Sequence, residues 1–167
     1  SDYAMDMTID NSGNVYMTGI TDQPSSYYDM VIVKYNSAGA QQWAQVWAGA
    51  AGFDDNSAGI YVDNSGNVYA AGYTEVTNGS NYNYITVKYN SSGVLQWAKQ
   101  YNNPLNSSDY AYMIDGDGTN VYVTGTSTAS GTGTDLFTIK YNAAGDSVWT
   151  ARYSGTNSIN EIPAGLK

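Results

Sequence analysis

Short stretches in which apolar and polar residues alternate recur along the chain, and this period of two is typical of β-strands. Residues 30–35 (MVIVKY) place Val31 and Val33 on one face of a strand and Ile32 and Lys34 on the other. The same alternation returns in residues 84–89 (YITVKY) and 136–141 (LFTIKY). Both faces carry bulky side chains, which predicts sheets that are packed between similar sheets.

The surrounding pattern predicts four strands in each of three successive units. In the first unit, the predicted strands are residues 5–10, 14–21, 30–35 and 41–47. In the second unit they are a strand ending at Asp63, then residues 67–74, 84–89 and 95–101. In the third unit they are a strand ending at Asp115, then residues 120–127, 136–141 and 147–153.

Two tight turns separate the predicted strands of every unit. The first turn has Asp in its first position and Gly in its fourth, in residues 10–13, 63–66 and 115–118. The second has Asn first and Gly fourth, in residues 36–39, 90–93 and 142–145. This pattern is typical of a type I turn after which glycine takes a positive φ. Each unit is therefore expected to run strand, turn, strand, variable loop, strand, turn, strand.

Three groups of residues recur in the same order, which identifies the units as repeats. Asn-Val-Tyr stands at 14–16, 67–69 and 120–122, with a spacing of 53 residues both times. Lys-Tyr-Asn and a Gly-x-x-x-Trp pattern follow it in each unit. The anchors are Asp10, Gly13, Tyr16, Lys34, Tyr35 and Trp43, then Asp63, Gly66, Tyr69, Lys88, Tyr89 and Trp97, then Asp115, Gly118, Tyr122, Lys140, Tyr141 and Trp149.

Four-stranded antiparallel units of about 50 residues are typical of the blades of a β-propeller. The sequence therefore predicts an all-β fold in which residues 1–167 form one repeat domain. The predicted parts are blade 1 at about 2–54, blade 2 at about 55–108, blade 3 at about 109–155 and a tail at 156–167.

The patterns D-x-S-G-N-V-Y-x-x-G and K-Y-N-x-x-G-x-x-x-W resemble the bacterial β-propeller repeat family called SBBP. The resemblance covers about residues 2–155. The third unit departs from the pattern, because it inserts Thr119 and has Gly116 and Asp117 in place of Asn-Ser. The resemblance implies a repeat module of large secreted or surface proteins, with no activity common to the family.

Composition narrows the classes of function. Lys and Arg total 6 against 15 Asp and Glu, and a net charge of −9 makes nucleic acid an unexpected partner. The chain has no cysteine and no histidine, so thiolate catalysis, Cys-type metal sites and histidine base catalysis are excluded. No apolar run approaches the ~20 residues that span a bilayer, and no membrane insertion or cofactor is predicted. Abundant Asn, Ser, Thr, Gly and Tyr with few Lys are typical of an extracellular or cell-surface protein.

Propellers usually close with four to eight blades, so three predicted blades leave two open ends. The tail at 153–167 resembles the lead-in to a fourth unit. We expect closure to come from outside these blades. A longer parent chain, two copies in a six-bladed ring, and a head-to-tail filament all satisfy this expectation.

Four aspartates are candidate calcium ligands, because calcium prefers carboxylate and amide oxygens. They are Asp10, Asp63, Asp115 and Asp117, and the stretch at 115–118 is the most calcium-like. Turn geometry explains the same positions, and it is the favoured interpretation. The repeated lysines and tryptophans are expected to pack between blades, since three copies argue against one unique catalytic site.

The segments that do not repeat are candidate binding loops, because repeat scaffolds place binding on such loops. They are residues 20–29, 73–83 and 126–135, with a second set at 48–55, 102–109 and 154–160. Tyr27, Tyr28 and Tyr82 are the best candidates to stack on a sugar or a protein partner. The alternative interpretation is that tyrosine is simply common in this chain.

No constellation of residues points to catalysis. We therefore expect a non-catalytic structural or adhesive module, secreted or on the cell surface, that associates with further blades or with itself. A surface glycan or protein is a second expected partner. The alternative is a fragment of a carbohydrate-binding or glycan-processing propeller whose site lies on the rim loops.

Overall fold

The computed structural model describes residues 1–22, 24 and 27–155. These residues form twelve β-strands and no helix, so they contain no helix long and apolar enough to cross a membrane. Of the predicted lead-in to a fourth unit at residues 153–167, Tyr153 ends a strand of the third unit, and residues 156–167 lie outside the described residues.

Three four-stranded antiparallel sheets make up the described part of the chain, as the sequence predicted. Sheet 1 contains β1 (Asp2–Ile9), β2 (Val15–Asp22), β3 (Tyr28–Tyr35) and β4 (Gln41–Trp47). Sheet 2 contains β5 (Asp55–Val62), β6 (Val68–Thr77), β7 (Ser80–Tyr89) and β8 (Leu95–Tyr101). Sheet 3 contains β9 (Asp109–Gly116), β10 (Val121–Ala129), β11 (Gly133–Tyr141) and β12 (Ser147–Tyr153). We call the sheets blades 1, 2 and 3, because each pairs its strands in chain order.

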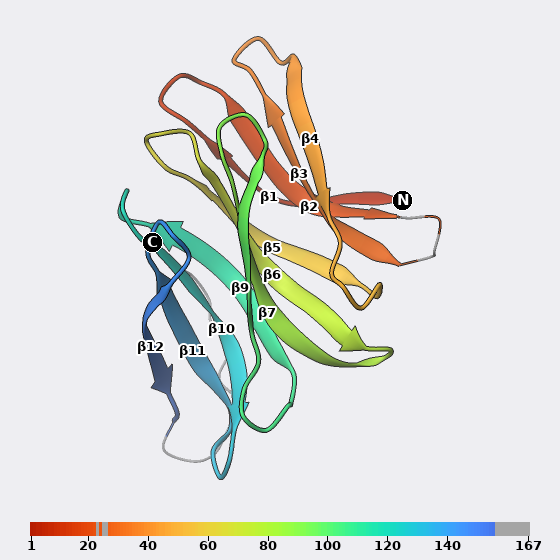
Figure 1. Cartoon of the computed structure of the whole chain (residues 1–167), viewed down its shortest axis with the longest axis vertical. Coiled ribbons are helices and arrows are strands. Elements are labelled where there is room, and N and C mark those ends of the chain that lie inside the picture. Colours follow the sequence, from red (N-terminus) through yellow and green to blue (C-terminus); the bar gives the residue numbers. More distant parts are fainter. Residues whose placement is uncertain (23, 25–26, 156–167) are drawn as a thin grey trace.

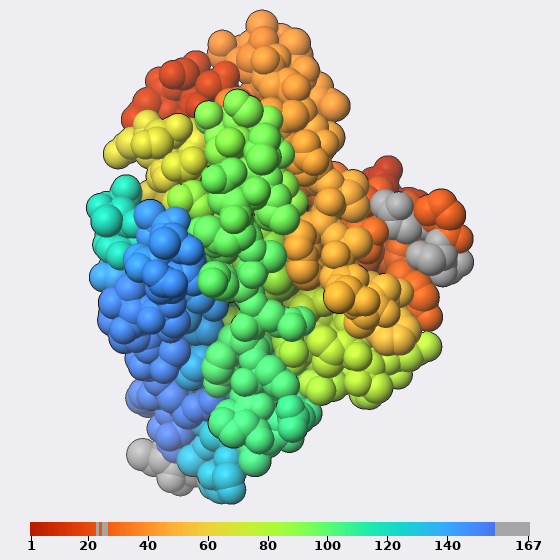
Figure 2. Space-filling view, viewed as in Figure 1, coloured from red at the N-terminus to blue at the C-terminus, as the bar shows by residue number. Residues whose placement is uncertain are grey.

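The blades follow one another in space as they do in the sequence, with blade 2 between the other two (Figure 1). The outer strands β4, β8 and β12 succeed one another across the face shown in Figure 2, in orange, green and blue. One apolar cluster fills the joint between blades 1 and 2, and a second fills the joint between blades 2 and 3. Tyr16, Met30 and Ile85 are buried in the first, and Tyr84 and Ile139 in the second. The core is therefore built between blades.

The third strand of each blade begins earlier than the alternation predicted. In blade 2, strand pairing continues to Thr77 and Ser80, so the expected loop at 73–83 is mostly a hairpin closed by Asn78 and Gly79. In blade 3, pairing continues to Ala129 and Gly133, within the expected loop at 126–135. The reason is that backbone N–H and C=O groups pair across adjacent strands whatever their side chains are.

The first turn of blade 3 corrects the predicted alignment. Asp115 does not begin a turn, because it lies in β9 and pairs with Tyr122. It therefore matches Tyr61, and the residue that matches Asp63 lies two positions later in the chain. Asp117 takes that place, and its N–H donates to the carbonyl oxygen of Asn120. The turn is one residue shorter than its counterparts, so the apparent insertion of Thr119 belongs to a shifted alignment.

A glycine in the second strand of each blade permits a bulge in the strand beside it. Gly72 faces Ser57 at the point where the register of β5 shifts, and a Cβ at Gly72 would overlap with the carbonyl oxygen of Asn56. Gly19 and Gly125 occupy the same place in blades 1 and 3 and meet the same kind of contact. The repeated glycine is therefore required by the close approach of the innermost strand.

Replacement of Gly72 by alanine is expected to lower the free energy of unfolding by at least about 2 kcal/mol, because the methyl group forces β5 and β6 apart. Chemical denaturation monitored by tryptophan fluorescence measures this change. Ser92→Ala, at an exposed turn position, is the control and is expected to stay within about 0.5 kcal/mol of the parent chain. Equal stability of the two variants would contradict the steric role of Gly72.

Candidate functional site

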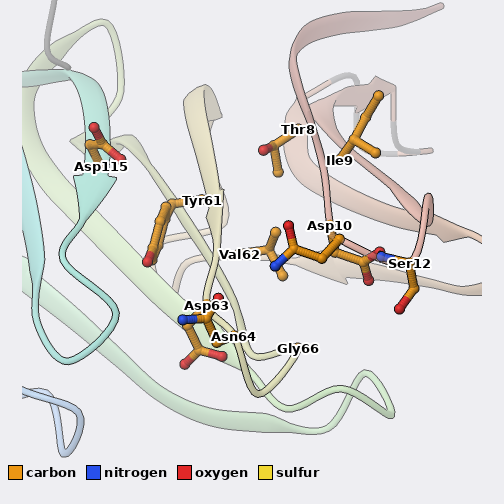
Figure 3. Close-up of a pocket in the computed structure, with 11 residues that line it drawn as sticks. Thr8, Ile9, Asp10, Ser12, Tyr61, Val62, Asp63, Asn64, Gly66 and Asp115 are labelled. Atoms are coloured by element: carbon orange, nitrogen blue, oxygen red, sulfur yellow. The ribbon is translucent and has the colours of Figure 1, made fainter.

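The first turns of blades 1 and 2 open onto a cavity of about 310 Å³ (Figure 3). Asp10, Asp63 and Asp115 line it together with Asn64 and Tyr61. The cavity thus collects three of the four aspartates that the sequence offered as calcium ligands, without Asp117. Within the described residues, no three acidic side chains are grouped closely enough to hold a metal ion.

The carboxylates of Asp10 and Asp63 accept hydrogen bonds from residues of their own turns. The carboxylate of Asp10 accepts hydrogen bonds from Ser12 N, from Asn14 N and Nδ2, and from Tyr16 Oη, at 2.7–3.0 Å. Burial raises the pKa of Asp10, but these hydrogen bonds more than offset it, and the pKa lies below its usual value. The carboxylate of Asp63 accepts the same set of bonds from its own turn.

The two preferred calcium candidates lie in different settings. Asp117 accepts hydrogen bonds from Asn120 N at 2.7 Å and from Tyr122 Oη at 2.7 Å, and the pKa of Asp117 is held well below its usual range. The first cause of that shift is the Asn120 backbone N–H. Asp115 accepts from Gly116 N. The aspartate oxygens of this turn therefore serve turn geometry.

The joint between blades 1 and 2 is made by one backbone carbonyl that accepts two hydrogen bonds. Trp43 Nε1 donates to the carbonyl oxygen of Ser91 at 3.1 Å, and Lys34 Nζ donates to the same oxygen at 3.3 Å. The indole covers Gly93, where a Cβ would lie 2.9 Å from two ring atoms of Trp43. Only glycine fits there, because the residue also has a positive φ of 79°.

The joint between blades 2 and 3 repeats this arrangement with the equivalent residues. Trp97 Nε1 donates to the carbonyl oxygen of Ala143 at 3.2 Å, and Lys88 Nζ donates to it at 2.9 Å. The indole of Trp97 covers Gly145, which has a φ of 82°. The repeated lysine and tryptophan therefore form a two-donor contact with the next blade.

A tyrosine holds each lysine of the joints in place. Lys34 Nζ lies 5.2 Å from the centre of the Tyr16 ring, and Lys88 Nζ lies 5.1 Å from that of Tyr69. The hydroxyls of these tyrosines donate to the carboxylates of Asp10 and Asp63 respectively. We call the face that carries tyrosine, lysine and tryptophan the front face of a blade, and the opposite face the back face.

Blade 3 has a front face that no blade covers in the described residues. Trp149 is 41% exposed, and Tyr153 is 64% exposed. Lys140 Nζ lies 5.3 Å from the centre of the Tyr122 ring, in the arrangement of the other lysines. Within the described part of the chain, Lys140 Nζ and Trp149 Nε1 donate no hydrogen bond. These are the donors that reach a neighbouring carbonyl in the two internal joints.

Blade 1 has the complementary uncovered back face. Gly39 has a φ of 79°, like Gly93, but a Cβ placed on it would meet no atom within 4 Å. Met7, Ile9 and Val46 are each about half exposed on this side, with relative exposures of 55%, 57% and 49%. The described blades therefore present two different halves of the joint that forms twice between them.

The predicted rim tyrosines are divided between two places. The rings of Tyr28 and Tyr3 lie 6.1 Å apart, and those of Tyr27 and Phe53 lie 5.5 Å apart, beside the segment that links blades 1 and 2. The third candidate belongs to another cluster, in which Tyr82 packs with Tyr73 at 5.6 Å and Tyr110 at 5.3 Å. No ring contact among the described residues joins Tyr82 to Tyr27 or Tyr28.

An acidic group is buried at the rim opposite the first turns. Asp55 is 1% exposed, and burial raises its pKa to about 6; hydrogen bonds from Gly49 N and Thr74 counter the shift, and the charge of Asp29 adds to it. Burial, and then the charge of Asp54, likewise raise the pKa of Asp29. The charged form of Asp55 is therefore disfavoured in the fold.

Sequence reasoning missed the acceptors of the joint and the buried acids. Ser91 and Ala143 carry different side chains and act through their backbone oxygens, so no residue type marks them. Their place in the sequence, two residues before the repeated glycine, is the available signal. The ion pair of Arg152 Nη1 with Asp135, at 3.0 Å, has no repeated partner and was not predicted.

Replacement of Trp97 by alanine is expected to lower the free energy of unfolding by at least about 2 kcal/mol, since it empties an internal joint. Trp149→Ala, the matched control, is expected to change it by less than about 1 kcal/mol when the chain is monomeric. Denaturant titration at low protein concentration measures both. Similar losses in the two variants would contradict the difference between covered and uncovered faces.

Ionisation of Asp55 is expected to destabilise the fold as pH rises from about 4 to about 6. The folded-state pKa, about 6, is above the ordinary value of 3.8, so this contribution to stability is complete below pH 4 and is lost above pH 6. Asp55→Asn should remove it, with a difference of up to roughly 3 kcal/mol between the two pH profiles. Urea titrations from pH 4 to pH 7 measure the profiles, and parallel profiles would contradict the assignment.

Comparison with known families places residues 42–83 in the family described as Beta-propeller repeat, SBBP. The match runs from β4 of blade 1 to the beginning of β7 in blade 2. No curated protein matches the chain. Residues 42–83 therefore match a β-propeller repeat, and this segment includes Trp43, one of the two donors of the first joint.

Proposed function

We propose that this chain is a non-catalytic structural module of a secreted or cell-surface protein, and that further blades complete it at its two end faces. The observation that carries the proposal is the pair of uncovered half-joints. Blade 3 presents Trp149 and Lys140, and blade 1 presents the turn that ends at Gly39.

The chemistry of the polar residues supports a structural role. In the cavity at the first turns, the carboxylates of Asp10 and Asp63 accept four hydrogen bonds each from their own turns. A general base or a metal ligand needs a carboxylate oxygen that is free to engage a substrate or an ion. Here those oxygens hold the tyrosines that orient the lysines of the joint.

Placement outside the cell is supported by composition. The chain has few basic residues, and its net charge of −9 favours solubility over contact with other anionic polymers. Its polar surface depends on Asn, Ser, Thr and Tyr more than on charge, since only 13% of the residues are charged. The SBBP repeat agrees with a building block used several times in one protein.

A tandem protein of two complete chains tests whether the end faces take further blades. The segment 154–167 that follows β12 is longer than the segments 48–54 and 102–108 that join the internal blades, so direct fusion leaves room for a joint. We expect the tandem to unfold at a temperature at least about 5 °C above that of the single chain, because docking buries both half-joints. Differential scanning calorimetry at low concentration measures the shift.

The matched control is the same tandem with Trp149→Ala in its first copy. This change removes the indole at the new joint and leaves the internal joints intact, so the gain in unfolding temperature should be lost. A tandem that unfolds like the single chain, or a gain that survives Trp149→Ala, would contradict the proposed function.

A further inference from the structure

The two uncovered faces of the chain match each other as the internal faces do. We propose that a second copy of this chain is the partner, and that copies dock head to tail with Trp149 of one on the turn at Ser37–Gly39 of the next. This inference rests on the proposed function, and it specifies which further blades complete the module.

The receiving turn of blade 1 already has the geometry of the two turns that are covered. Asn36 Oδ1 accepts from Ala38 N at 3.0 Å and from Ala40 N at 2.9 Å, as Asn90 and Asn142 do in their own turns. Gly39 N donates to the carbonyl oxygen of Asn36, again as in the other turns. The carbonyl of Ser37 therefore stands where those of Ser91 and Ala143 accept two donors.

The donating face of blade 3 is also in place before any partner arrives. Tyr122 Oη donates to Asp117, and Lys140 lies over the Tyr122 ring. Trp149 lies 6.0 Å from Tyr122, close to the 5.9 Å between Trp97 and Tyr69 in the internal joint. Binding then requires little ordering of these side chains, which lowers its entropic cost.

The apolar surfaces of the two faces correspond as well. Four positions of blade 1 that match buried back-face residues of blades 2 and 3 are only partly covered, although Val33, which matches Val87 and Ile139, is buried. They are Val15, Met17, Val31 and Tyr35, against Val68, Ala70, Ile85 and Tyr89 in blade 2 and Val121, Val123, Phe137 and Tyr141 in blade 3. A copy docked on blade 1 would remove this surface from water in the same way.

Direction follows from the polar groups of the joint. Contact between two blade 3 faces would offer Lys140 and Trp149 no turn carbonyl of the kind that accepts in the internal joints, and contact between two blade 1 faces would lack the lysine and tryptophan donors. Only a front face on a back face pairs Lys140 Nζ and Trp149 Nε1 with the Ser37 carbonyl. Each copy carries a net charge of −9, so association should strengthen when salt screens the repulsion.

Complementation between two full-length variants tests the proposal. Trp149→Ala removes the donating face and keeps the receiving face. Gly39→Asn keeps the donating face and places a side chain where the indole would lie, and asparagine tolerates a positive φ. Met7→Glu, at an exposed back-face position, is a second receiving-face variant in case Gly39→Asn fails to fold.

We expect the parent chain to associate in sedimentation velocity at about 0.5 M salt, either as a closed pair or as a ladder of larger species. Each variant alone should be monomeric, with affinity weakened at least about 100-fold. A mixture of Trp149→Ala with a receiving-face variant should form a 1:1 complex, because it restores one intact joint.

Three outcomes would overturn the proposal: a monomeric parent chain at millimolar concentration, association unaffected by either variant, or variants that do not complement. These outcomes separate it from the proposed function. A stabilised tandem with a monomeric single chain would retain the structural module and reject the second copy, in favour of blades supplied by one longer chain. An unstabilised tandem would reject both.

Discussion

One backbone carbonyl in each receiving turn organises the relation between blades. It accepts an indole N–H and a lysine ammonium from the preceding blade, at 3.1 and 3.3 Å in the first joint and at 3.2 and 2.9 Å in the second. Its position is set by an Asn-capped turn that ends in glycine at positive φ. The same glycine lacks the Cβ that would block the indole, so a single residue both closes the turn and opens the docking surface.

The rest of each blade supports this contact. Aspartate in the first turn accepts from the tyrosine hydroxyl, the tyrosine ring holds the lysine, and the lysine reaches the next blade. These links are local within a blade, so each blade arrives at the joint with its donors arranged. Because the apolar core also lies between blades, burial and hydrogen bonding both depend on having a neighbour. A blade at either end of such an array lacks half of what stabilises the inner one.

The sequence predicted the strands and turns well because these depend on local physics. Period two, Asx at the start of a turn and glycine at its end act over a few residues. The prediction was wrong in the first turn of blade 3, where Asp115 was assigned the place that Asp117 holds. This turn is one residue shorter than its counterparts, so residues before it no longer align with the other blades at a constant spacing. Tyr27, Tyr28 and Tyr82 were predicted as one kind of rim site, and their neighbours on adjacent strands divide them between two clusters.

The sequence by itself determined that three similar blades exist and which residues recur in each, since repetition at 53 residues is visible without coordinates. Only the tertiary structure decided what the recurring residues do. The acceptor of the joint is a backbone oxygen, which no residue type identifies, and its partners Trp97 and Lys88 lie about 50 residues away in the chain. The raised pKa of Asp55 likewise depends on burial by separate segments. Both effects arise when segments that are distant in the sequence pack together and exclude water. A sequence pattern does not show which distant segments come into contact.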